Sequence, residues 1–273
     1  MKKIAFTLVL NGMPFIKRQA QIIPKHFDKW YIIEGATKPH HDTSWCTDID
    51  SRFFSTDKLS VDGTTEFLDG IASDKISVIR KHDFWDGKRE MCNSFMAEVN
   101  DCILMEFDVD EIWQDNVLSD VLNYAEVNDN FDCMVFRCNY FVGPRTKIIT
   151  KNGYADDWIM WRRLWKVRQH THWIAHEPPI LNGTERYLDK DFTENRGWVF
   201  DHFAYAIREQ LEFKQNFYRY EGAVDGWSRL QAAPKPCRLG DYLKWVTDGT
   251  IVDNVRSGER DLHTEIEQFK SSD

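Results

Sequence analysis

Two aspartates one residue apart, Asp108 and Asp110, follow a short apolar run that begins at Ile103, and Glu111 comes next. Alternate side chains of an extended chain point to the same side, so we expect both aspartates to project together beyond a strand. Two carboxylates this close repel each other unless a positive charge lies between them. Mg²⁺ and Mn²⁺ take oxygen ligands and commonly share them with phosphate oxygens. The pattern therefore indicates a metal and diphosphate site, and the alternative is an acidic loop that closes a buried strand. Glu111 would point away from the ion and support its ligands.

A basic pair, Lys88 and Arg89, opens a predicted helix over residues 87–99. The helix dipole disfavours cations at this end, so their presence favours a bound anion such as phosphate. Asn93 lies four residues after Arg89 and shares its side of the helix. The alternative is a solvated basic turn.

Glu34 ends a predicted strand just before Gly35 and Ala36. At the edge of an open parallel sheet, a carboxylate in this position can accept hydrogen bonds from a ribose or a base. The alternative is a glutamate of a surface loop.

A histidine and a carboxylate, His176 and Glu177, precede two prolines that restrict the backbone. Glu177 can act as a general base, with His176 orienting it or a substrate hydroxyl. The alternative for this segment is a structural turn.

His202 follows the apolar pair Val199-Phe200 and Asp201. Imidazole is a common metal ligand that binds Mn²⁺ more readily than Mg²⁺, so His202 could complete the site that begins at Asp108. The alternative is a histidine that caps a helix or lies in the core.

Apolar runs alternate with helical patterns over the first 110 residues, which is typical of an α/β fold with a mainly parallel central sheet and flanking helices. We predict strands at 4–10, 30–34, 76–79 and 103–107, and helices at 14–27, 64–71 and 87–99. Ligands of such sheets bind beyond the carboxyl ends of the strands, where the aspartates fall. The later sequence predicts a helix at 114–127, a strand at 132–142, extended segments within 145–181, an amphipathic helix from Phe203 and a charged segment from about Val252. The tryptophans cluster at Trp158, Trp161, Trp165 and Trp173, and we expect most of them in the core.

Composition limits the possible partners of the 273-residue chain. A net charge of −9 argues against a broad nucleic-acid surface. The cysteines form no C-x-x-C pair, which favours a reducing compartment; they are Cys46, Cys92, Cys102, Cys133, Cys138 and Cys237. No stretch approaches the roughly 20 apolar residues of a membrane span, and the first apolar run is too short for a signal peptide. We expect a soluble cytoplasmic protein without a transmembrane segment.

These motifs, in this order, resemble the GT-A-fold glycosyltransferases, especially the family 2-like enzymes, and the Asp-Val-Asp-Glu wording is also similar to family 17 N-acetylglucosaminyltransferases. The resemblance covers about residues 3–220 and lies in the strand 4–10, Glu34, the segment 85–93, Asp108–Glu111, the stretch 162–165 leading to His176-Glu177, and the segment 201–205. It implies a Rossmann-like GT-A domain over 1–220, with a nucleotide-binding half at 1–112, an acceptor half at 113–220 and a C-terminal helical extension at 221–273.

The resemblance also implies an activity: the transfer of a sugar, with inversion, from a nucleoside diphosphate to a hydroxyl acceptor. We expect a UDP-sugar as the donor and a glycan, lipid-linked or protein hydroxyl as the acceptor. It assigns nucleotide contacts to Glu34, Lys88, Arg89, Asn93 and Asp108, Mn²⁺ or Mg²⁺ ligands to Asp108, Asp110 and His202, and catalysis to Glu177 with His176. Two departures concern the acidic pair usual before the acceptor helix, here His176-Glu177, and Asn11-Gly12 after the first strand.

Two other functions remain open at this point. Haloacid dehalogenase-type phosphatases also end an apolar strand in Asp-x-Asp. Their chemistry requires a small or hydroxyl residue soon after this motif, whereas Glu111 and Ile112 follow it in this sequence. A non-catalytic sugar-nucleotide-binding module is the third possibility. Donor hydrolysis separates it from a transferase, and activity on an aryl phosphate would favour the phosphatase.

Overall fold

The structure, a computed structural model, describes residues 1–38, 50–157 and 160–256. Cys46, Trp158 and the end of the charged C-terminal segment lie outside these ranges. Within them, no helix is both long and apolar enough to cross a lipid bilayer.

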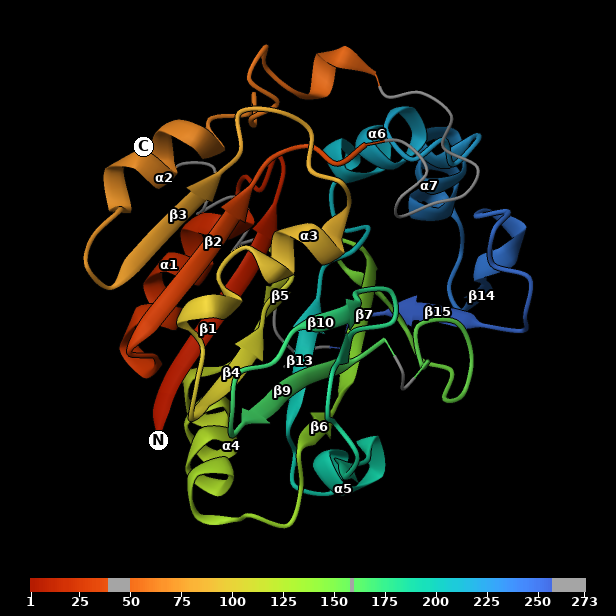
Figure 1. The fold of residues 1–273 in the computed structure, drawn as a ribbon. Coiled ribbons are helices and arrows are strands. Elements are labelled where there is room, and N and C mark those ends of the chain that lie inside the picture. The colour runs from red at the N-terminus through yellow and green to blue at the C-terminus, as the bar shows by residue number, and fades with distance from the viewer. Residues whose placement is uncertain (39–49, 158–159, 257–273) are drawn as a thin grey trace.

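The central sheet has the strand order β12-β6-β9-β4-β1-β2-β3 (Figure 1). Its strands are β1 (Lys2–Val9), β2 (Lys29–Glu34), β3 (Ile76–Arg80), β4 (Cys102–Glu106), β6 (Cys133–Val135), β9 (Arg162–Val167) and β12 (Tyr187–Leu188). β1 runs parallel to β2 and β4, and β2 runs parallel to β3, whereas β9 runs antiparallel to β4 and β6. The carboxyl ends of β1, β2 and β4 therefore meet at one edge. This topology confirms the predicted α/β fold with a mainly parallel sheet.

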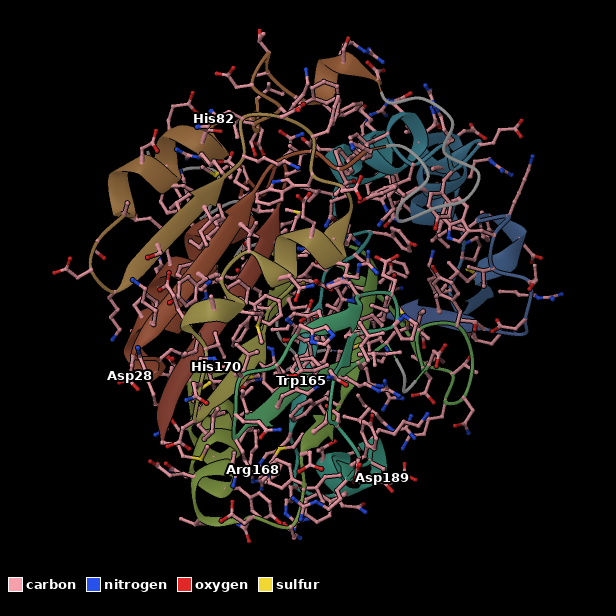
Figure 2. The ribbon with its side chains drawn as sticks, viewed as in Figure 1. Asp28, His82, Trp165, Arg168, His170 and Asp189 are labelled. Atoms are coloured by element: carbon pink, nitrogen blue, oxygen red, sulfur yellow. The ribbon has the colours of Figure 1, made fainter. Side chains whose placement is uncertain are left out.

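Helices cover both faces of this sheet because successive strand residues point to opposite sides and both sets are apolar. The helices beside it are α1 (Phe15–His26), α2 (Thr64–Ile71), α3 (Lys88–Asn93) and α4 (Asp115–Val127). Ala5 of β1 belongs to the core formed with α1, α2 and α4, whereas its neighbour Phe6 belongs to the core formed with α3. Figure 1 shows α3 in front of the sheet and α1 behind it. Trp165, near the centre of Figure 2, packs edge-on against Trp173 in the core on the α3 side.

A second sheet has the order β14-β15-β8-β7-β13-β5. Its strands are β5 (Glu111–Ile112), β7 (Arg137–Gly143), β8 (Thr146–Ile148), β13 (Val199–His202), β14 (Cys237–Arg238) and β15 (Ile251–Asn254). β5 begins directly after Asp110, so the chain passes from the first sheet to the second across the two aspartates. β13 pairs antiparallel with β5 and places His202 opposite Glu111. The sheet pairing thus brings the second half of the chain to the acidic turn.

The remaining elements lie around the carboxyl edge or at the periphery: β10 (Trp173–Ala175), β11 (Ile180–Leu181), α5 (Lys190–Glu194), α6 (Arg208–Asn216), α7 (Ala223–Ala232) and the 3₁₀ helices Ser51–Phe53, Met96–Glu98 and Leu239–Asp241. In Figure 1, α6 and α7 lie side by side at the end of the molecule toward which β1 and β2 point. β10 and β11 form a hairpin whose turn holds His176 and Glu177.

Two elements have other boundaries in the structure than the sequence predicts. The predicted strand 132–142 is two strands, because β6 pairs with β9 in the first sheet and β7 pairs with β13 in the second. The helix predicted over 87–99 ends at Asn93 and continues as the 3₁₀ helix Met96–Glu98.

The C-terminal part also differs from its predicted form. The helix predicted from Phe203 begins only at Arg208, because Phe203 N bonds the Asp110 carbonyl and fixes a buried turn. The C-terminal extension, predicted to be helical, contains α7 but also β14 and β15, because β15 pairs with β8.

Candidate active site

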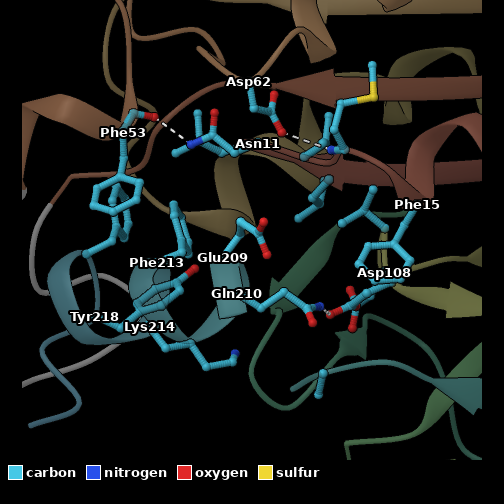
Figure 3. Close-up of a pocket in the computed structure, with 18 of the residues that line it drawn as sticks. Asn11, Phe15, Phe53, Asp62, Asp108, Glu209, Gln210, Phe213, Lys214 and Tyr218 are labelled. Carbon is cyan, nitrogen blue, oxygen red and sulfur yellow. Dashed lines mark hydrogen bonds between the residues drawn. The ribbon is translucent and has the colours of Figure 1, made fainter. Parts of the chain in front are cut away.

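A cavity of about 1100 Å³ opens at the carboxyl edge of the central sheet. It is lined by the loop after β1, the start of α2, the first turn of α3, the acidic turn, the β10–β11 turn, the end of β13 and α6. Six predicted site residues line it: Lys88, Asp108, Asp110, His176, Glu177 and His202. Glu34, Arg89 and Asn93 are not among the described residues that line it. In Figure 3, Glu209, Gln210, Phe213 and Lys214 of α6 face Asn11, Asp62 and Asp108 across the cavity.

Asp110 and His202 form a pair that the β5–β13 register brings together. His202 Nε2 lies 3.3 Å from Asp110 Oδ1, and Gln210 Nε2 donates to Asp110 Oδ2 at 3.2 Å. Burial disfavours both charges, but Asp110 raises the pKa of His202 overall, and His202 lowers the pKa of Asp110. His202 Nδ1 is buried without a hydrogen-bond partner in the described residues. The pair is therefore charged and keeps one imidazole nitrogen uncommitted.

Arg163 of β9 connects Asp108 with Glu111. Its Nη2 lies 2.8 Å from Asp108 Oδ2 and 2.7 Å from Glu111 Oε1, and the side chain is 3% exposed. Burial opposes the charge of Asp108, but Arg163 and His176 lower its pKa to about 2. Burial dominates at Glu111 and raises its pKa to about 7 in spite of Arg163. Asp108 is thus ionised with one oxygen bound to Arg163, while Glu111 acts on the site through that arginine.

Glu106, the last residue of β4, lies beside His176 in the interior. His176 Nε2 is 2.6 Å from Glu106 Oε1. Burial lowers the pKa of His176, but Glu106 more than compensates and the pKa is raised. Glu106, Asp108 and His176 each offer a ligand atom, and these atoms lie within 4.8 Å of one another.

This group and the Asp110–His202 pair together offer oxygen and nitrogen atoms to a divalent cation. Glu106 Oε2, His176 Nδ1 and His202 Nδ1 are buried without hydrogen-bond partners in the described residues. The carboxylate oxygen can bind an ion directly, and each imidazole can do so once it has lost its proton. Carboxylate oxygens and imidazoles are ligands that suit Mn²⁺ and, with more water, Mg²⁺. The donor set therefore fits a divalent cation.

Lys88 and Glu177 form an ion pair at the cavity wall. Burial raises the pKa of Glu177, but Lys88 and His176 outweigh it and the pKa is lowered. Asn93 holds this arrangement from α3, because its amide donates to Trp173 O at 3.1 Å and accepts from Trp173 N at 2.8 Å. Asn93 thus fixes the hairpin that carries Glu177.

The structure gives Glu34 and Arg89 other surroundings. Glu34 is 0% exposed and accepts from Arg80 Nε at 2.7 Å, Thr65 Oγ1 at 2.5 Å and Ser60 N at 3.1 Å. Both carboxylate oxygens are occupied, so this residue joins β2 to β3 and α2 instead of facing the cavity. Arg89 is exposed and is not among the described residues that line the cavity.

Asn11 and Gly12 fix the loop after β1. Asn11 Nδ2 donates to Phe53 O at 2.7 Å (Figure 3). Asn11 Oδ1 accepts from Val61 N at 2.9 Å. A Cβ at Gly12 would lie 2.8 Å from Val109 Cγ2, between the two aspartates. The loop therefore packs closely against the acidic turn and leaves no room for a larger residue at position 12.

Sequence reasoning missed Glu106, Arg163 and Lys214. Glu106 is two residues before Asp108, so strand alternation could have placed it on the same side. Arg163 follows Arg162 directly in an otherwise apolar strand. A charged residue in such a strand is often buried and then needs a partner of opposite charge. Lys214 gave no such signal.

No model of a known protein family matches the sequence, and no curated protein matches it either. Among solved structures the fold is similar to S. aureus TarS, with a TM-score of 0.44 and 10% identity over 84% of this chain and 42% of that chain. TarS 1–349 gives a TM-score of 0.40 and 10% identity over 61% and 47%. TarS 1–349 in complex with UDP-GlcNAc gives 0.36 and 11% over 52% and 35%. The chain spans less than half the length of each of these structures. Similarity this low says nothing of activity, which depends on the residues of the site.

Proposed function

We propose that this protein is a glycosyltransferase that moves a sugar from a nucleoside diphosphate to a hydroxyl acceptor with the help of a divalent cation. The observation that carries the proposal is the presence in one cavity of carboxylates and imidazoles for a cation, lysines for phosphate, and the separate carboxylate Glu177. A diphosphate carrying a divalent cation is a ligand that satisfies both signs of charge at once.

The donor end of the site would be organised by Asp108, Asp110 and His202, with Glu106 and His176 beside them, holding Mn²⁺ or Mg²⁺. When bound, such a cation stabilises the negative charge that develops on the leaving diphosphate. Arg163 keeps Asp108 ionised, and Gln210 fixes the second carboxylate oxygen of Asp110. Lys88 offers an ammonium to the phosphates from α3. These residues would bind and orient the donor before any bond breaks.

Glu177 would take the proton from the acceptor hydroxyl as that oxygen attacks the sugar carbon. Its lowered pKa keeps Glu177 ionised at neutral pH, although the pairing with Lys88 that lowers this pKa also makes it a weaker base. Lys88 shares this carboxylate, so movement of Lys88 toward the phosphates would release Glu177 for the acceptor. We propose attack on the side opposite the diphosphate, which inverts the configuration of the sugar carbon. The donor is proposed to be a UDP-hexose or UDP-N-acetylhexosamine, and the acceptor a glycan, lipid-linked or protein hydroxyl.

A thermal-shift panel of nucleotide sugars tests the proposal. A UDP-sugar should raise the melting temperature in the presence of Mn²⁺, and much less in EDTA, because a ligand that binds the native state stabilises it. Release of free sugar from the same donor should follow. Binding without any turnover would favour a non-catalytic module, and hydrolysis of an aryl phosphate would favour the phosphatase. Absence of any nucleotide-dependent shift would contradict the proposal.

A further inference from the structure

Lys214 enters the cavity from α6, an element separate from the one that carries Lys88. It lies one turn after Gln210, which donates to Asp110 Oδ2 and to Phe203 O, at 3.2 and 2.5 Å. Residues four apart share one side of a helix, so the contact that anchors Gln210 on the acidic turn also aims Lys214 at the cavity (Figure 3). Lys214 and Asp110 line the same cavity although they are far apart in the sequence.

The ammonium of Lys214 makes no ion pair with the carboxylates of residues 1–38, 50–157 and 160–256. It lies instead 5.1 Å from the centroid of the Tyr205 ring and 5.9 Å from that of Tyr218. Ring faces attract a cation without neutralising it, so the two rings favour this position of Lys214 and leave its charge available. Lys88, by comparison, is already bound to Glu177.

The surroundings of this charge point to an anion. Burial lowers the pKa of Lys214, although Asp110 acts in the opposite direction and Lys88 adds to the lowering. Two lysines and two aspartates therefore meet in the same space. A simple carboxylate ligand would be repelled by Asp108 and Asp110, whereas a diphosphate with a divalent cation presents positive charge to the aspartates and phosphate oxygens to the lysines.

We propose that Lys214 is a second phosphate-binding residue, whose ammonium contacts the terminal phosphate of the diphosphate group from the side of α6. This inference rests on the proposed function and adds a residue to it. Because the contact comes from the protein itself, part of the affinity for a diphosphate should persist without a metal ion. The diphosphate would then be held from two elements, with Lys88 on α3 and Lys214 on α6.

Calorimetric titration of uridine, UMP and UDP into the full chain, with Mn²⁺ and with EDTA, tests the proposal. Lys214→Met should weaken UDP binding about ten- to a hundredfold in both conditions, the range expected for one charge-assisted hydrogen bond. The loss should be smaller for UMP and absent for uridine. Lys214→Arg should keep part of the affinity, because the charge is retained. Lys244→Met, which removes an exposed lysine that does not line the cavity, should bind like the wild type.

The outcomes separate this inference from the proposed function. If the wild type binds no UDP in either condition, the proposed function fails. If the wild type binds UDP and Lys214→Met binds it equally well, the phosphate contact of Lys214 is refuted while the proposed function stands. An equal loss for UMP and UDP overturns the assignment to the terminal phosphate. Thermal unfolding of the ligand-free variants shows whether a loss of affinity comes from misfolding. Lys214→Arg, which keeps the charge, shows whether the loss in Lys214→Met comes from the missing charge.

Discussion

His176 Nε2 lies 2.6 Å from Glu106 Oε1, although 70 residues separate the two in sequence. This buried contact joins the end of β4 to the turn that carries Glu177. Because Glu106 contacts the turn that carries the proposed base and lies two residues before Asp108, a substitution of Glu106 should affect both the base and the acidic turn.

Glu106→Gln should make stability depend on pH in a defined direction. The raised pKa of His176 contributes stability that is fully present below the unfolded value of about 6.5 and is lost as the pH rises through the folded value. Without the carboxylate, this contribution disappears. Urea unfolding should therefore show a larger deficit against the wild type at pH 5.5 than at pH 8.5. Glu185→Gln, an exposed substitution, is the control and should show no such trend. A deficit that is larger at pH 8.5 would contradict this account.

Arg163→Met should lower the free energy of unfolding by about 3–5 kcal/mol, because it leaves buried carboxylates without their partner. The pKa of Glu111, already raised to about 7, should rise further. An acid with a raised pKa in the folded state loses stability as the pH increases, so the deficit should grow between pH 5 and pH 8. Chemical denaturation at several pH values measures it.

Arg168→Met provides the matched control for Arg163. Arg168 is 41% exposed, pairs with Asp132, and lies far from α6 in the view of Figure 2. The loss of an exposed pair costs about 1 kcal/mol or less. Equal effects of the two substitutions would mean that Arg163 is not the central cation of a buried cluster.

Asp110→Asn should abolish the Mn²⁺-dependent part of nucleotide-sugar binding, because an amide is a poorer ligand and leaves His202 without its counter-charge. The thermal shift produced by donor plus Mn²⁺ should collapse to the value in EDTA. Asp120→Asn on the exposed side of α4 should leave the shift intact. An unchanged titration of donor plus Mn²⁺ with Asp110→Asn would remove Asp110 from the site.

Glu177→Gln should separate proton removal from donor binding. The amide cannot accept the acceptor proton, so we expect kcat for transfer to fall about 10²- to 10⁴-fold. Donor affinity should hold or increase, since Lys88 is no longer paired with a charged carboxylate. Parallel measurements of kcat and of the donor Kd test both parts. A full rate of transfer would exclude Glu177 as the base.

Glu34→Gln tests two roles of this residue: the nucleotide contact that the sequence predicts, and the buried hydrogen bonds that the structure shows. Replacing the carboxylate weakens the bond to Arg80, so stability should fall by about 1–3 kcal/mol. Nucleotide affinity should change little, because the side chain is enclosed by Arg80, Thr65 and Ser60. A selective loss of nucleotide binding at unchanged stability would restore the sequence-based prediction.

The acidic edge could be predicted because the apolar run and its alternation are local properties of the chain. The α/β fold followed for the same reason. The surroundings of Glu34 could not be read in this way, since Arg80 becomes its neighbour only through the register of β2 and β3. Helical spacing likewise shows that Gln210 and Lys214 share a side, but not that this side lies on Asp110.

Strand pairing also joins the two predicted halves of the domain, 1–112 and 113–220, in one sheet. β6, β9 and β12 from the later part of the chain complete the sheet that begins with β1. Strand pairing between distant segments has no local signature, so the sequence could not show it.

The chain passes from one sheet to the other across Asp108 and Asp110, and this has a consequence for the evolution of the site by recombination. The aspartates come from the first 112 residues, whereas Arg163, His202 and Lys214 come from the rest. Neither part carries a whole site, so neither can be transplanted as a working module. A recombination that exchanged only the later part would set a different arginine, histidine and lysine around the same two carboxylates. The affinity for the proposed ion and donor could then change in a descendant whose acidic turn had not changed.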